Sequence, residues 1–215
     1  MSESKKGLII SIVTLVLFNI LIILLKFVDV KEVGLSGFNN TYLHEYNKAL
    51  DIISDILLYL SIGAFVAVVV YFIYKLIKNK GKNVDYRLIV YFLGMVIVVI
   101  TYLVFEFFVK VNGRPYEPSE SSFPSTHILL TTYILLPITT LFFKKDRDKE
   151  TKEKFDLETG ISLIAFIIIG VEVILRFWSG MHWITDCLGG LILGVFYFGV
   201  YYFVISLIKE KKSQE

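Results

Sequence analysis

The stretch RFWSGMHWITD, residues 176–186, separates two long apolar runs at residues 158–175 and 185–208. A shorter polar stretch, PSTH at residues 124–127, stands in the same way before the apolar run 127–143. Charged and titratable side chains are costly at a membrane boundary, so clusters of them beside apolar runs are typical of functional sites. The two stretches therefore predict a membrane protein with a polar site at the ends of its helices.

The composition also indicates an integral membrane protein. The chain has 215 residues, of which 55% are hydrophobic and 15% aromatic, and this is too apolar for a soluble domain of the same length. A helix needs about 20 apolar residues to cross the hydrocarbon core. Six runs qualify, at about 8–27, 52–77, 88–109, 127–143, 158–175 and 185–208. We therefore expect an all-α, polytopic six-helix bundle that forms a single domain over residues 1–215.

The distribution of basic residues predicts the orientation of this bundle. Short cytoplasmic loops collect lysine and arginine. Residues 5–6, 75–87, 144–154 and 209–212 hold 16 of the 22 lysines and arginines, and six crossings put all these segments on one side. We therefore expect cytoplasmic N- and C-termini in the plasma membrane. The polar segments 110–126 and 176–184 then lie together on the extracytoplasmic side.

The second polar stretch contains a histidine and a carboxylate at helical spacing. His182 and Asp186 are four residues apart, which on a helix places them on one face. A carboxylate that accepts the imidazole N–H raises the basicity of the opposite ring nitrogen, which then becomes a competent nucleophile. Arg176 would lie on another face of a continuous helix, but Ser179 and Gly180 offer a break that lets the chain turn back.

The first polar stretch is suited to bind an anion. Ser125 is a good N-cap for a helix that begins near His127. The backbone N–H groups of Ser125, Thr126 and His127 are then expected to form an anion cradle at the helix start. His127 would be placed to protonate a departing oxygen as a general acid.

Three cationic side chains complete the expected site. Arg114 and Arg176 can bind a phosphate with two parallel hydrogen bonds each, whereas Lys110 would act as a point charge. Simpler roles exist for each group alone, since arginines near span ends often reach lipid phosphates and Glu172 could pair with Arg176 one turn away. These roles give no reason for two histidines, two arginines and a His–Asp pair to share one face, so phosphate chemistry is the stronger interpretation.

An outer segment before the second span leaves two roles open. Residues 42–56 form an amphipathic stretch that could lie along the membrane interface. This stretch is either a lid over the polar site or a connector between spans.

These residues resemble the three signature stretches of the type-2 phosphatidic acid phosphatase superfamily, KxxxxxxRP, PSGH and SRxxxxxHxxxD. Arg114-Pro115 match the end of the first stretch, and Pro124, Ser125 and His127 match the second. Arg176, His182 and Asp186 match the third at full spacing. The chain departs from the pattern at three positions: Phe107 stands where the family has its lysine, Thr126 replaces the glycine, and Leu175 replaces the serine. Lys110, three residues after Phe107, is a candidate replacement for that lysine.

The resemblance implies hydrolysis of a lipid phosphomonoester or diphosphate through a phosphohistidine, with no metal and no cofactor. His182 would attack phosphorus, Asp186 would orient it, and His127 would protonate the leaving group. Arg114, Arg176 and Ser125 would hold the phosphoryl oxygens. The expected partners are membrane lipids and a phosphorylated lipid substrate, not nucleic acid. Undecaprenyl diphosphate, phosphatidylglycerophosphate and phosphatidate all remain candidate substrates.

Two other functions fit the same residues. A lipid or sugar acceptor in place of water would make the protein a phosphotransferase. A non-catalytic lipid- or anion-binding or transport protein would use the same basic pocket, and the missing lysine at Phe107 favours that alternative. A haloperoxidase is the least expected member of the superfamily, because those enzymes are soluble.

Overall fold

The chain forms a bundle of helices, described here from a computed structural model. The structure describes residues 1–27, 46–82, 84–109, 111, 113–116, 119–141 and 157–214. Its helices are α1 (Glu3–Phe27), α3 (Lys48–Lys78), α4 (Tyr86–Phe107), α5 (Thr126–Leu141), α6 (Leu157–Trp178) and α7 (Ile184–Lys212). Over these ranges the only β-type pairing is an isolated bridge between Gly113 and Ser121. The predicted all-α architecture is confirmed.

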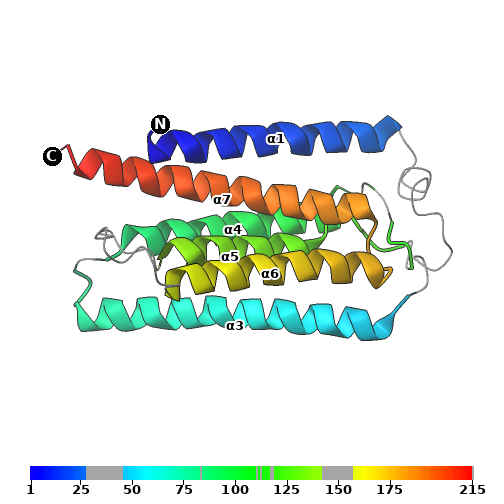
Figure 1. The fold of residues 1–215 in the computed structure, drawn as a ribbon, viewed down its shortest axis with the longest axis horizontal. Coiled ribbons are helices and arrows are strands. Elements are labelled where there is room, and N and C mark those ends of the chain that lie inside the picture. Colours follow the sequence, from blue (N-terminus) through cyan, green and yellow to red (C-terminus); the bar gives the residue numbers. More distant parts are fainter. Residues whose placement is uncertain are drawn as a thin grey trace.

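Successive helices run in opposite directions, so the loops gather at the two ends of the bundle (Figure 1). The N- and C-termini lie at one end, where the Ser4 hydroxyl donates to Glu210 Oε2 over 2.6 Å. The segment before α5 and the turn between α6 and α7 lie at the other end, together with the start of α3. The prediction that the two polar stretches share one end of the bundle is therefore confirmed.

Five helices, α1, α3, α4, α6 and α7, are long and apolar enough to cross a membrane, and the chain is a multi-pass membrane protein. The remaining helix, α5, is apolar but has only 16 residues, about 24 Å at 1.5 Å per residue. It packs against α3, α4, α6 and α7, and residues 131–140 are all buried. Because α5 is surrounded by other helices, its length does not have to match the thickness of the lipid.

The bounds of the observed helices agree with the expected spans to within a few residues. One difference concerns the stretch that was expected to lie along the membrane interface. Residues 48–56 are the first turns of α3, which continues without a break to Lys78, so they form no separate interfacial helix. Residues 42–45 and 142–143 lie outside the described part of the chain. The Asn47 side chain caps α3 by accepting two backbone N–H groups of its first turn. The capped start of α3 brings polar residues to the end of the bundle that holds both polar stretches.

Close packing against α7 fixes the segment that precedes α5. A Cβ atom added to Gly190 would lie 2.5 Å from the carbonyl oxygen of Ser125. Phe123, two residues earlier, is 1% exposed and stacks on Phe18 of α1 with ring centroids 5.8 Å apart. Glycine at position 190 therefore permits the backbone contact that holds the start of α5 on α7.

This contact predicts a selective effect of adding one methyl group to α7. We expect Gly190→Ala to destabilise the protein by about 1–3 kcal/mol, because the new Cβ would overlap backbone rather than a movable side chain. Gly170→Ala in α6 is the matched control, since a Cβ there meets nothing within 4 Å. Thermal unfolding in detergent measures both variants, and equal melting temperatures for the two would contradict this packing.

Candidate active site

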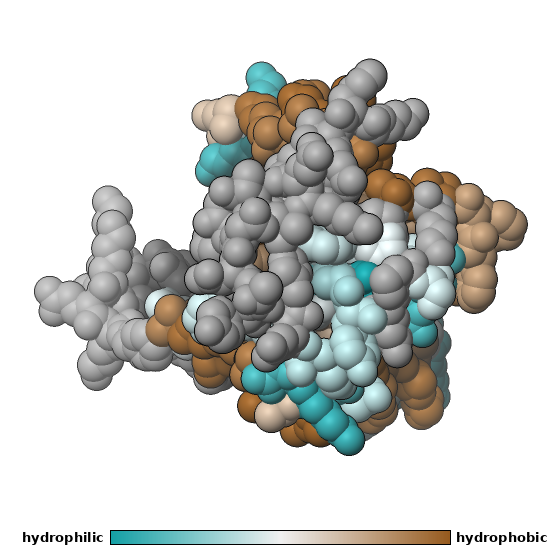
Figure 2. Space-filling view, turned by 90° about the vertical axis from the view of Figure 1, so that its right-hand side faces the viewer, coloured by the Kyte–Doolittle hydropathy of each residue, from teal (hydrophilic) through white to brown (hydrophobic). Residues whose placement is uncertain are grey.

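Polar side chains gather at the end of the bundle where the two polar stretches meet. Figure 2 looks onto this end and shows hydrophilic residues in the middle, between hydrophobic surfaces of the surrounding helices. His127 lies close enough to Arg176 and His182 to be influenced by their charges, and His182 is likewise influenced by Arg114 and Arg176. The structure therefore brings together four of the predicted site residues, which come from the loop before α5, from α5, from α6 and from the turn before α7.

The His182 ring is held through a serine. His182 is 4% exposed, and its Nδ1 lies 3.2 Å from Ser122 Oγ and 3.7 Å from Asp186 Oδ2. The Ser122 hydroxyl also makes a short hydrogen bond to Asp186 Oδ2. Since a hydroxyl has one hydrogen and Ser122 donates it to the carboxylate, its oxygen accepts the Nδ1–H of His182. The lone pair of His182 is then on Nε2.

The predicted direct hydrogen bond between His182 and Asp186 is not formed. The separation of 3.7 Å exceeds hydrogen-bond range, because α7 begins at Ile184 and His182 lies in the turn before it, not on the same helix face. Asp186 Oδ2 instead accepts the backbone N–H of Trp183 at 2.9 Å and the Ser122 hydroxyl. Sequence analysis missed Ser122, since a serine in a loop carries no spacing signal.

Two hydrogen bonds join the segment before α5 to the residues at the start of α7. The Ser125 N–H donates to the Asp186 carbonyl over 3.0 Å, and the Trp183 indole N–H donates to the Gly113 carbonyl over 2.9 Å. The expectation that the Ser125 N–H belongs to an anion cradle is therefore wrong, because Asp186 already accepts it. Thr126 and His127 occupy the first two positions of α5, where backbone N–H groups have no partner within the helix.

The predicted N-cap bond from the Ser125 side chain is also not formed. Ser125 Oγ is buried and has no hydrogen-bond partner among the described residues. A buried hydroxyl without a partner is unusual in a protein interior.

Arg176 pairs with α3 rather than with its own helix. The side chain is 2% exposed, and its Nη1 donates to Asp51 Oδ1 over 2.6 Å. Tyr46 donates its hydroxyl to the other oxygen of Asp51 over 3.0 Å. Glu172, the expected alternative partner of Arg176, instead accepts the Ser54 hydroxyl at 2.6 Å.

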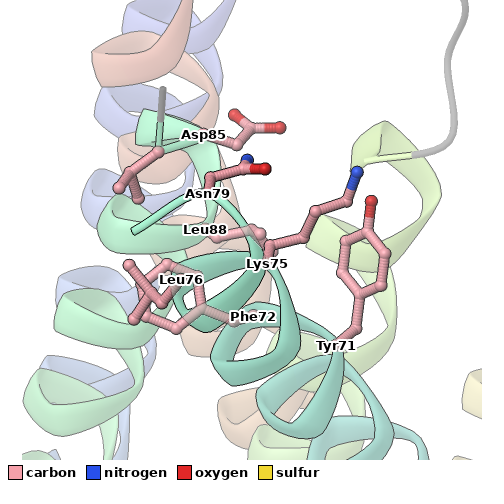
Figure 3. Close-up of a pocket in the computed structure, with 8 residues that line it drawn as sticks. Tyr71, Phe72, Lys75, Leu76, Asn79, Asp85 and Leu88 are labelled. Carbon is pink, nitrogen blue, oxygen red and sulfur yellow. The ribbon is translucent and has the colours of Figure 1, made fainter. Parts of the chain in front are cut away.

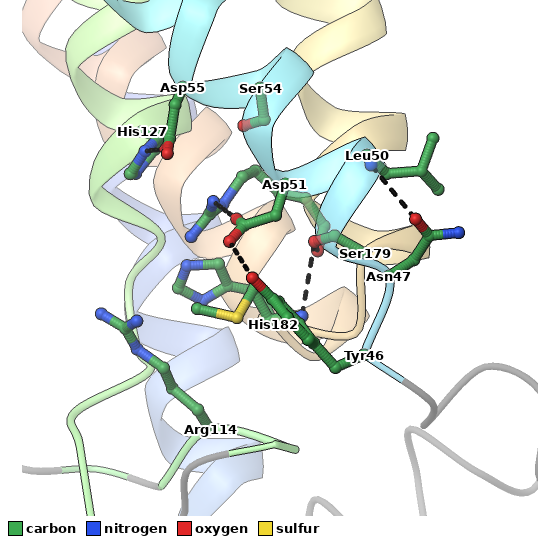
Figure 4. Close-up of polar contacts among 12 residues, drawn as sticks. Tyr46, Asn47, Leu50, Asp51, Ser54, Asp55, Arg114, His127, Ser179 and His182 are labelled. Atoms are coloured by element: carbon green, nitrogen blue, oxygen red, sulfur yellow. Dashed lines mark hydrogen bonds and ion pairs between the residues drawn. The ribbon is translucent and has the colours of Figure 1, made fainter.

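A second carboxylate of α3 contacts the first polar stretch. Asp55 Oδ1 lies 2.9 Å from His127 Nε2 (Figure 4). Sequence analysis did not select Asp51 or Asp55. The signal that marks them is their position near the start of an apolar run, where an unpaired carboxylate would be costly.

Arg114 lies in a short loop beside His182. Its Nε donates to the Ser121 carbonyl over 3.1 Å, and its Nη1 lies 3.0 Å from Glu120 Oε2. Phe107, at the position of the family lysine, is 72% exposed. Lys110 lies outside the described residues.

A small cavity lies next to His182 and has both polar and apolar lining residues. The polar ones include Arg114, Ser122, Thr126 and His182, with Glu106. The apolar ones include Tyr102, Phe105, Phe123 and Leu129.

The surroundings of His182 favour a neutral ring. Burial lowers the pKa of His182, and the positive charges of Arg176 and Arg114 act in the same direction, while Asp186 opposes them. The ordinary value is about 6.5, so the ring is neutral at pH 7. A neutral imidazole has the lone pair that nucleophilic attack requires.

Comparison with known proteins found one family model and one solved structure of similar fold. Residues 106–209 match the family model described as the PAP2 superfamily. The fold is similar to the crystal structure of the first transmembrane PAP2 type phosphatidylglycerolphosphate phosphatase from Bacillus subtilis, with a TM-score of 0.60 and 18% sequence identity. The alignment covers 94% of this chain and 96% of that one. A comparison with curated proteins gave no significant match.

The geometry around His182 makes a prediction about its protonation. We expect the ring to titrate with a midpoint below about 6.5 and to carry its proton on Nδ1 at neutral pH, because burial disfavours the charged form and Ser122 accepts Nδ1–H. Nitrogen-15 NMR of the detergent-solubilised protein measures both properties, and His182→Gln identifies the signal. A midpoint above 6.5, or a proton on Nε2, would contradict this arrangement.

Proposed function

Because residues 106–209 of this chain match the PAP2 superfamily model, we propose that the protein is a membrane lipid phosphatase that forms a phosphohistidine at His182. The observation that carries the proposal is the hydrogen-bond chain from His182 Nδ1 through Ser122 to Asp186. These two hydrogen bonds fix the His182 ring and leave its Nε2 as the nucleophile. The arginines and His127 lie around the same ring.

In the first step, the Nε2 lone pair of His182 attacks phosphorus, and the bond from phosphorus to the lipid oxygen breaks. The electron pair of that bond goes to the leaving oxygen, which takes a proton from His127. His182 becomes positively charged as the new N–P bond forms. The Ser122 hydroxyl and the Asp186 carboxylate stabilise this charge through Nδ1–H.

The phosphoryl oxygens have several candidate partners in the chain. Arg176 Nε and Ser125 Oγ are buried and, within the described ranges, make no hydrogen bond. Arg114 lines the cavity beside His182, and the first-turn N–H of Thr126 adds the positive end of the α5 dipole. Together these groups suit a phosphate dianion. Lys110 would add a further charge as a replacement for the family lysine.

In the second step, water attacks the phosphohistidine. The N–P bond breaks, its electron pair returns to His182 Nε2, and His127 accepts a proton from the water. Side chains of this chain supply each proton and each positive charge in both steps. The proposed reaction is therefore independent of a metal or cofactor.

The proposed substrate is a phosphorylated lipid of the outer leaflet. The lysines and arginines near both termini predict that their end of the bundle is cytoplasmic, which puts His182 on the extracytoplasmic side of the plasma membrane. In this proposal α5 is the sixth span of a single domain over residues 1–215. Polar and apolar residues line the cavity together, and this mixture supports a phosphorylated lipid as the substrate class.

Among the candidate substrates, phosphatidylglycerophosphate comes first. It is the lipid named for the Bacillus subtilis protein of similar fold. Undecaprenyl diphosphate and phosphatidate also carry a terminal phosphate on a long apolar chain, so the same site would accommodate them. The headgroup contacts proposed here involve the phosphate alone and are common to all three.

We test the proposal by phosphate release from these three lipids, each with and without excess chelator. His182→Ala is expected to lower turnover on the order of 10³-fold or more, because the nucleophile is lost. Lys75→Ala is the matched control, since Lys75 lines a separate cavity at the α3–α4 turn, at the opposite end of the bundle (Figure 3). Its turnover should equal that of the unaltered protein.

Each other outcome points to a different function. Unchanged turnover in His182→Ala would remove the nucleophile assignment, and loss of turnover in chelator would contradict metal independence. Transfer of phosphate to a lipid or sugar would identify a phosphotransferase. Binding of all three lipids without turnover would identify an anion-binding protein.

A further inference from the structure

Two carboxylates of α3 contact two groups of the proposed active site. Asp51 and Asp55 are four residues apart and therefore lie on one face of the helix. Asp51 pairs with Arg176 of α6, and Asp55 pairs with His127 of α5. Figure 4 shows both carboxylates extending from α3 toward the region that holds His127 and His182. None of the three family signature stretches includes α3.

Each carboxylate contacts one nitrogen of its partner and leaves a second nitrogen of that partner without a hydrogen bond in the part of the chain that the structure describes. Asp55 takes Nε2 of His127, and the Nδ1 of that ring makes no hydrogen bond with any described residue. Asp51 takes Nη1 of Arg176, while the Nε of Arg176 is buried and unpartnered in the same part of the chain. Each carboxylate therefore holds its partner from one side.

The start of α3 is itself held in place. The Asn47 N–H donates to the Ser179 carbonyl over 2.9 Å, which links α3 to the turn before His182. The Ser54 hydroxyl bonds Glu172 of α6, and the Tyr46 hydroxyl bonds Asp51. The position of Asp55 relative to the site is therefore defined by contacts of the residues that precede it, from Tyr46 to Ser54.

The charge of Asp55 also matters for a general acid. Asp55 is the carboxylate that contacts His127 across the α3–α5 contact, with Oδ1 2.9 Å from Nε2. A general acid must carry a proton when the leaving oxygen departs, so a carboxylate at this position has a chemical role.

We propose that Asp55 is a positioning residue for His127: it holds Nε2 and leaves Nδ1–H for the leaving oxygen. The proposal rests on the proposed phosphatase function. In the first step the proton moves from His127 Nδ1 to the oxygen, and the Asp55 carboxylate remains hydrogen-bonded to Nε2–H.

The test compares two phosphomonoesters that differ in how much their leaving groups need a proton. Octyl phosphate releases a basic alkoxide and needs one, whereas p-nitrophenyl phosphate releases a stable phenolate and does not. Asp55→Asn is expected to lower kcat/KM for octyl phosphate by about 10- to 100-fold, part of what general acid catalysis contributes, and for p-nitrophenyl phosphate by less than about 3-fold. His127→Ala should show the same selectivity.

Asp51→Asn is the matched control. It removes a carboxylate from the same face of α3, but Asp51 contacts Arg176 and not His127. Its effect should be equal for both substrates and appear mainly in KM, since Arg176 is proposed to bind phosphate in both. Asp55→Glu keeps the charge and should recover part of the octyl phosphate activity. The double variant Asp55→Asn, His127→Ala should be no slower than His127→Ala alone.

Equal losses of Asp55→Asn on both substrates would overturn the proposal. A gain on both would show instead that Asp55 competes with the substrate for the site. If Asp55→Asn does not fold, the substrate preference of Asp55→Glu decides, and an unchanged preference overturns the proposal. Failure of the unaltered protein to hydrolyse either ester is a different result, because it contradicts the proposed function itself.

Discussion

Asp186 is the residue on which the arrangement of the site depends. It is fully buried, and its carboxylate accepts the Ser122 hydroxyl and the Trp183 N–H. Its backbone carbonyl accepts the Ser125 N–H, so this one residue binds both polar stretches. A buried carboxylate is stable only when such donors surround it. The same donors that satisfy Asp186 therefore place His182 next to the start of α5.

The rest of the bundle helps to hold the two polar stretches together. The short helix α5 lies at the centre, enclosed by α3, α4, α6 and α7, so that its first turn reaches the polar end without facing lipid. Gly190 of α7 lets the backbone of Ser125 approach closely. The turn with Gly180, at φ 78°, reverses the chain between α6 and α7. Each of these features sets the position of the backbone around the site.

Sequence alone predicted the helices and the two polar stretches, because both depend on local properties. An apolar run long enough to cross a membrane forms a helix wherever it occurs, and the spacing of Arg176, His182 and Asp186 is contained in eleven residues. The contacts of Ser122 with His182 and of Asp55 with His127 join residues 60 and 72 positions apart. Local spacing contains no information on such pairs. The direct His182–Asp186 bond was predicted wrongly because the helix begins after His182, not before it.

The central claim is that the His182 ring forms a bond to phosphorus, and a trapped intermediate tests it most directly. Rapid quenching in alkali during turnover preserves a phosphohistidine, and tandem mass spectrometry of the digested protein locates the phosphoryl group. The account predicts phosphate on the peptide that contains His182 and none on the peptide that contains His127. Phosphate on another residue, or its absence from His182 while the enzyme turns over, would contradict the account.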